Sequence, residues 1–180
     1  MGSDDVTKHS LLRFGKELTD LRLSHVQFLI DEKIDESQTL EYKKPTNNPQ
    51  KDCDNIAEVI ASFLNTEGGI IVYGVSEIRE KEHRYPDKIV WSSCAKEKFE
   101  NLLLSRVQPW NEKISINRIE NENNLQEGIF IIEVPKSNNP PHMSNYIYCQ
   151  RLNYQTKPME HESVYRVFQT SWIRRRASLE

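Results

Sequence analysis

The most regular helical pattern in the chain lies between Asp52 and Leu64. Its apolar residues recur at spacings of three and four, which places them on one side of an α-helix: Ile56, Val59, Ile60, Phe63 and Leu64. Gly68-Gly69 follows this stretch, and glycine closes a helix at low cost because it adopts the left-handed conformation. The pattern predicts a helix that ends in a tight turn.

Three other segments have helical spacing. Positions 7–32 predict a helical arm, and a second helix starts at Ser92 or Ser93 and ends before Pro109. A last helix begins near Glu160. Its apolar residues are expected to face the core: Val164, Val167, Phe168 and Trp172.

Strands are predicted between these helices. Alternating residues mark half-buried strands at 40–44 and 114–117, and continuous apolar runs mark buried strands at 70–75 and 129–134. A further strand covers 146–151, whereas the charge-rich stretch 76–90 predicts a long loop or an irregular hairpin. The order of elements predicts one α/β or α+β domain with a mixed sheet flanked by helices.

The boundaries of this domain follow from the same pattern. We expect an N-terminal helical arm at 1–33, the domain itself at 34–176 and a short tail at 177–180 that resembles a cloning remnant. No apolar run approaches the roughly 18 residues of a membrane-spanning helix. With three widely spaced cysteines and no apolar leader, the chain is expected to be cytoplasmic with reduced thiols.

Charge is distributed unevenly along the chain. The net charge is −3, yet residues 151–180 hold six basic residues against three acidic ones. A basic end of this kind can contact a phosphate backbone. A solvated helix end with cations near the negative pole of its dipole explains the same charges, so both interpretations stay open.

Two carboxylates, Glu36 and Glu41, lie five residues apart, and Lys43 follows on the same strand face as Glu41. An odd offset sends side chains to opposite faces of a regular strand, so the two glutamates converge only if Glu36 lies in the bend before the strand. An exposed acidic turn is the alternative.

Four short motifs in this order resemble the Schlafen-type AlbA-like domain family. The first runs from Glu36-Ser37 to Leu40-Glu41-Tyr42-Lys43, and the second is Ile60-Ala61-Ser62-Phe63-Leu64-Asn65-Thr66-Glu67-Gly68-Gly69. The third is Tyr73-Gly74-Val75-Ser76-Glu77, and the fourth joins Tyr148-Cys149-Gln150-Arg151 to Thr156-Lys157-Pro158. The resemblance covers residues from Glu36 to about Lys157.

The resemblance implies a nucleic-acid-binding domain. Family members that cleave RNA hold a divalent metal with three carboxylates, which correspond here to Glu36, Glu41 and Glu77. Glu77 stands where the family commonly has Asp. Magnesium or manganese suits such oxygen ligands and can polarise a phosphodiester, and Lys43 would assist at the scissile phosphate.

The predicted activity is therefore a metal-dependent endoribonuclease acting on structured RNA such as tRNA, with catalysis left open. The alternatives are a non-catalytic RNA- or DNA-binding module of a regulator and an ATP-binding accessory domain, although no phosphate-binding loop motif occurs. A homodimer is also left open. The candidate residues for backbone contacts are Lys43, Lys44, Arg151, Lys157, Arg174, Arg175 and Arg176.

Overall fold

The computed structural model describes residues 21–177, apart from the side chains of Arg175 and Ala177. The N-terminal part of the predicted helical arm and the last three residues lie outside the described residues. Within them, α2 (Leu23–Asp31) is the one described helix of the arm.

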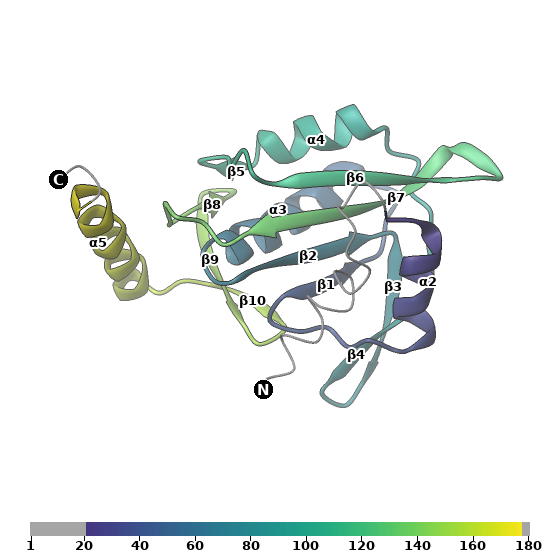
Figure 1. Ribbon diagram of the computed structural model, residues 1–180, viewed down its shortest axis with the longest axis horizontal. Coiled ribbons are helices and arrows are strands. Elements are labelled where there is room, and N and C mark those ends of the chain that lie inside the picture. The colour runs from purple at the N-terminus through teal and green to yellow at the C-terminus, as the bar shows by residue number, and fades with distance from the viewer. Residues whose placement is uncertain (1–20, 178–180) are drawn as a thin grey trace.

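The central sheet contains β1 (Leu40–Lys43), β2 (Gly68–Tyr73), β7 (Asn124–Pro135) and β6 (Ser115–Asn121), in the order β1-β2-β7-β6. β1 runs parallel to β2, whereas the β2–β7 and β7–β6 pairs are antiparallel. The helix α3 (Pro49–Leu64) connects the two parallel strands. The predicted mixed sheet flanked by helices is thus confirmed (Figure 1).

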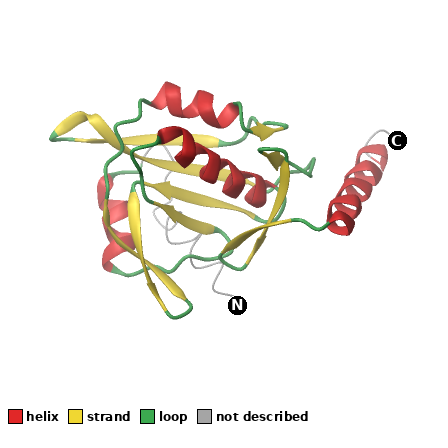
Figure 2. Ribbon diagram, turned by 180° about the vertical axis from the view of Figure 1, so that it is seen from behind, coloured by secondary structure: helices red, strands yellow, loops and turns green. Residues whose placement is uncertain are grey.

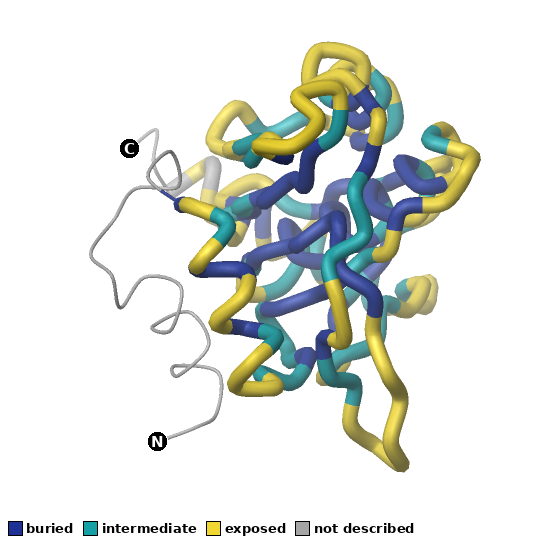
Figure 3. Tube along the Cα trace, turned by 90° about the vertical axis from the view of Figure 1, so that its right-hand side faces the viewer, coloured by how far each residue is buried: buried dark blue, intermediate teal, exposed yellow. Residues whose placement is uncertain are grey.

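Alternation along β2 divides the core into two layers. Ile71 and Tyr73 pack on one face with α3 and with α4 (Lys96–Leu104), where the rings of Phe99 and Phe130 stack at 4.2 Å. Ile70 and Val72 pack on the opposite face with α2. Figure 2 shows α3 and α4 on one side of the sheet, and Figure 3 shows the buried strands between the exposed loops. Both faces of β2 are buried, as its continuous apolar run predicts.

A second sheet packs beside α3. Its strands are β5 (Val107–Gln108), β8 (Met143–Ser144), β9 (Ile147–Leu152) and β10 (Gln155–Pro158), in the order β10-β9-β8-β5. A separate hairpin of β3 (Val75–Glu80) and β4 (His83–Ile89) occupies the stretch predicted as a loop or hairpin. No helix among residues 21–177 is both long and apolar enough to span a bilayer.

Two details of the helices differ from expectation. α4 begins at Lys96 and not at Ser92, because Ser92 instead exchanges backbone hydrogen bonds with Gly128. The last helix, α5 (His161–Ala177), does not bury its predicted apolar face: Phe168 is 49% exposed and Trp172 is 65% exposed. Helical periodicity identifies an apolar face but does not say whether another element covers it.

Gly74 shows why a glycine is needed between β2 and β3. Its φ is +130°, and a Cβ atom placed there would lie 2.2 Å from Ile129 Cγ2. Backbone strain and overlap therefore both act against a side chain.

We predict that Gly74→Ala lowers the free energy of unfolding by about 2–4 kcal/mol, measured by urea denaturation. Gln126→Ala, at an exposed position of β7, serves as the control and should change it by less than about 0.5 kcal/mol. Equal stability of the two variants would contradict this explanation of Gly74.

Candidate functional site

The bend before β1 brings Glu36 and Glu41 together. Glu36 lies outside the strand, and its backbone N–H donates to Arg84 O at 3.0 Å, which ties the bend to β4. Its Oε1 accepts a hydrogen bond of 3.0 Å from the backbone N–H of Tyr42. This is the arrangement that the odd spacing of the two glutamates requires.

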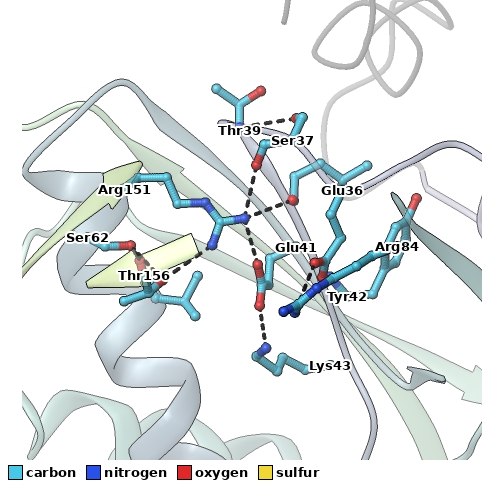
Figure 4. Close-up of polar contacts among 12 residues, drawn as sticks. Glu36, Ser37, Thr39, Glu41, Tyr42, Lys43, Ser62, Arg84, Arg151 and Thr156 are labelled. Atoms are coloured by element: carbon cyan, nitrogen blue, oxygen red, sulfur yellow. Dashed lines mark hydrogen bonds and ion pairs between the residues drawn. The ribbon is translucent and has the colours of Figure 1, made fainter. Parts of the chain in front are cut away.

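Glu41 is buried between two cations. Its Oε1 pairs with Lys43 Nζ, and its Oε2 lies 2.6 Å from Arg151 Nη2 (Figure 4). The Lys43 side chain is 27% exposed, whereas that of Arg151 is fully buried. The Lys43 side chain is therefore partly accessible to solvent, whereas the Arg151 side chain is not.

Arg151 connects β9 to the turn before β1. Its Nη2 donates to Ser37 O at 2.9 Å and to Leu40 O at 3.2 Å, and its Nη1 donates to Thr156 Oγ1 at 3.3 Å. The guanidinium also lies over the Phe63 ring, 5.0 Å from its centroid. These contacts correct the expectation that Arg151 binds a phosphate backbone, because a fully buried side chain cannot contact one; its role is to position Glu41.

Arg84 on β4 faces the other two carboxylates. Its Nη1 is 3.5 Å from Glu36 Oε2 and 3.7 Å from Glu77 Oε1, both longer than a normal hydrogen bond. The same guanidinium lies 5.3 Å from the centroid of the Tyr154 ring. Arg84 Nε is buried and has no hydrogen-bond partner among residues 21–177.

The three carboxylates affect one another electrostatically. The pKa of Glu36 is raised from 4.5 to about 8, first by burial and then by the negative charges of Glu41 and Glu77. The backbone hydrogen bond from Tyr42 and the charge of Lys43 oppose this shift. Glu36 is therefore mostly protonated at neutral pH.

A pocket of about 410 Å³ opens beside this cluster. One wall comes from α3 and the other from β1, β4 and the turn that enters β10. The residues that line it are Glu41, Lys43, Asn55, Glu58, Val59, Arg84, Tyr154, Gln155 and Thr156. Burial and the nearby charge of Asp54 raise the pKa of Glu58, and the charge of Lys43 opposes this shift.

A divalent metal would require the oxygens of Glu36, Glu41 and Glu77 to surround one point. Glu36 Oε2 is buried and has no hydrogen-bond donor among residues 21–177, as a metal ligand could be. However, the Arg84 guanidinium faces both Glu36 and Glu77, and the described residues contain no group of three acidic, His or Cys side chains placed to hold an ion. As arranged, Glu36, Glu41 and Glu77 do not fit a three-carboxylate metal site.

The remaining basic residues predicted to bind nucleic acid are dispersed. Lys44 follows β1 and Lys157 lies on β10, and both are exposed. Arg174 and Arg176 are exposed on α5, and Arg174 lines a different pocket together with Lys136. The side chain of Arg175 lies outside the described residues.

Sequence reasoning missed Arg84 and Tyr154. Arg84 lies in a charge-rich hairpin where several arginines and lysines look alike, and only the pairing of β3 with β4 turns it toward the carboxylates. Tyr154 follows Asn153, whose φ of +55° marks the tight turn between β9 and β10. Predicting a hairpin over residues 147–158 would have placed Tyr154 in its turn, and this is the sequence signal that could have identified it.

A family model described as Schlafen, AlbA_2 matches residues 36–174. The chain belongs to the Schlafen AlbA_2 family. This match begins at Glu36 and includes the whole carboxylate cluster and its pocket. The Schlafen AlbA_2 family is associated in general with nucleic-acid binding.

Similarity to solved structures extends to the fold. The crystal structure of the DIP2311 protein from Corynebacterium diphtheriae matches with a TM-score of 0.52 and 15% sequence identity, covering 80% of this chain and 31% of that chain. The chain thus corresponds to about a third of the length of that protein, and at this identity the similarity concerns the fold alone. No curated protein matches the sequence.

The raised pKa of Glu36 predicts a specific pH dependence of stability. Between its unfolded value of 4.5 and its folded value of about 8, the folded protein holds a proton that the unfolded chain has released. Stability therefore falls as pH rises through this window. Glu36→Gln cannot titrate, so its stability relative to wild type should increase by up to about 1.4 kcal/mol per pH unit.

Urea unfolding of both proteins at several pH values across this window measures the difference. Glu80→Gln, at the exposed end of β3 and away from the cluster, is the matched control. Parallel stability curves for wild type and Glu36→Gln would show that Glu36 is not buried as described.

Proposed function

We propose that this chain binds nucleic acid in the pocket beside the carboxylate cluster, with RNA favoured over DNA. The observation that carries the proposal is the arrangement of Lys43, Arg84 and Tyr154 along one pocket of about 410 Å³. Cationic side chains bind the phosphate of a nucleotide, and an aromatic ring stacks on its base. The pocket provides both kinds of group.

Arg84 supports the phosphate-binding part of the proposal. Within the described residues its guanidinium is held by two long ion pairs, and its buried Nε lacks an acceptor. The protonation of Glu36 near neutral pH also weakens the competing carboxylate charge. A phosphate oxygen at Nη1 or Nη2 would therefore make shorter, charge-assisted hydrogen bonds than the carboxylates do.

Lys43 is the second candidate contact. Glu41 retains the buried Arg151 as a partner, so Lys43 can turn toward a ligand without leaving Glu41 unpaired. The exposed Lys44 lies next to it in sequence and extends the positive charge toward solvent.

Tyr154 supports binding to unpaired bases. Base stacking on an aromatic ring contributes about 1–3 kcal/mol, and an arginine beside the ring adds a cation–π contact. A base must be unpaired to stack in this way, and unpaired bases are frequent in the loops and ends of folded RNA. This is why RNA is the favoured ligand.

A metal-dependent endoribonuclease is the second candidate function. It is favoured by the closeness of Glu41 and Glu77 to the buried Glu36, whose Oε2 has no hydrogen-bond donor among the described residues. It requires Arg84 to leave Glu36 and Glu77, because its guanidinium occupies the position between them. Binding does not depend on that rearrangement.

The binding proposal predicts the effect of two substitutions. Tyr154→Leu should weaken the affinity for a short single-stranded RNA by about 5-fold to 100-fold, since stacking is lost. Lys43→Gln should weaken binding and lower the slope of log Kd against log salt by about one, since one phosphate contact is lost. Fluorescence anisotropy across a salt series measures both.

Lys96→Gln is the matched control, because Lys96 is an exposed lysine on α4 and does not line the pocket. It should change the affinity by less than about two-fold, as expected for a lysine without a phosphate contact. The same affinity for wild type, Tyr154→Leu and Lys43→Gln would contradict the proposal, as would tighter binding of ATP than of RNA.

The second candidate is tested by cleavage. If it holds, wild type cleaves a folded tRNA substrate when magnesium or manganese is added, and Glu41→Gln does not. Glu80→Gln, outside the cluster, should retain any cleavage seen for wild type. RNA binding without cleavage under all of these conditions would reject the endoribonuclease and leave the binding proposal intact.

A further inference from the structure

The outer face of α5 carries large apolar side chains that are exposed. Tyr165 is 59% exposed, Phe168 49%, Trp172 65% and Ile173 66%. Spacings of three and four place the first three of these side chains along one stripe of the helix. A group of large exposed apolar residues of this kind is typical of an interaction surface and uncommon elsewhere on a protein surface.

The opposite face of α5 attaches the helix to the domain. Val164 and Val167 are half-buried, and the buried Ser171 hydroxyl donates to Pro140 O. Phe168 borders the outer face: it is 49% exposed, and its ring meets the Tyr148 ring of β9 edge-on at 5.9 Å. In Figure 1 α5 lies at one end of the molecule, beyond the second sheet.

Acidic residues lie at the beginning of α5 and arginines gather at its end, with Arg166 between them paired to Glu162 at 3.6 Å. Glu160 and Glu162 are exposed at its beginning, and Arg174 and Arg176 are exposed at its end. An identical helix placed antiparallel would bring the acidic end of each copy to the arginine end of the other. A parallel arrangement would instead place like charges together.

We propose that the outer face of α5 binds a second copy of this chain, with the two α5 helices antiparallel about a two-fold axis near Phe168. Such an interface is self-complementary, as a two-fold dimer requires. Phe168 and Trp172 of each copy lie close to the axis and supply the apolar contact. Glu162 and Arg176 continue the same stripe, at spacings of three and four from Tyr165 and Trp172, and supply the charge pairs at each end. Opposed helix dipoles add to the attraction.

The size of this face limits the affinity. A helix of 17 residues is about 25 Å long, and its outer stripe is smaller than the roughly 800 Å² per partner of a standard interface. The dimer should therefore be weak, with a dissociation constant of about 10–100 μM. This proposal does not depend on the proposed nucleic-acid binding.

Sedimentation equilibrium of the full chain, treated with nuclease and freed of nucleic acid, tests the dimer. The average mass should rise from 21.2 kDa toward twice that value as concentration increases. Trp172→Gln should raise the dissociation constant at least 10-fold, because it removes the central apolar contact. Leu125→Gln changes an equally exposed residue, 65% exposed on β7, and should leave it unchanged.

Charge reversal distinguishes the antiparallel arrangement from other dimers. Glu162→Lys alone should weaken the dimer, and the combination of Glu162→Lys with Arg176→Glu should restore it, because opposite charges then face each other again. Circular dichroism of each variant verifies that α5 stays helical. A mass of 21.2 kDa at all concentrations, a dimer unaffected by Trp172→Gln, or failure of the paired reversal to restore association would overturn the proposal.

Discussion

The buried ion pair between Glu41 and Arg151 holds the site together. Taking two charges out of water is unfavourable unless the remaining polar groups are satisfied. The terminal nitrogens of Arg151 meet this condition through the Ser37 and Leu40 carbonyls and the Thr156 hydroxyl, whereas its buried Nε has no partner among the described residues. The pair thus joins the central sheet to the second sheet, and it fixes the turn from which Glu36 and Glu41 converge.

The rest of the site follows from that constraint. With Glu41 held at the base of the pocket, Glu36 is buried next to a negative charge, so its pKa is raised and it is mostly protonated. Arg84 faces Glu36 and Glu77 at distances too long for strong hydrogen bonds. In this arrangement the Arg84 guanidinium faces both Glu36 and Glu77, where the family resemblance implies a metal.

Local pattern accounted for much of the fold. The apolar runs at 70–75 and 129–134 correctly indicated strands buried on both faces, and the stripe from Ile56 to Leu64 correctly indicated α3. The odd spacing of Glu36 and Glu41 also indicated that they can meet only if Glu36 lies in the bend before the strand. These features depend on neighbours in the sequence, which the sequence displays directly.

Features that depend on distant elements could not be obtained in this way. Arg151 resembles any basic strand residue until β9 packs against the turn at 37–40, which buries it. Arg84 and Tyr154 are 70 residues apart in the sequence, and only the fold places one over the other. The apolar face of α5 was assigned to the core because periodicity carries no information about what covers a helix.

Photo-crosslinking of a bound single-stranded RNA, followed by mass spectrometry of the modified peptides, tests the central claim most directly. If RNA occupies the pocket, adducts form at Tyr154 and in the segments of β1 and β4 that carry Lys43 and Arg84. Adducts confined to α5, with none at Tyr154, would place the nucleic acid elsewhere and contradict the account.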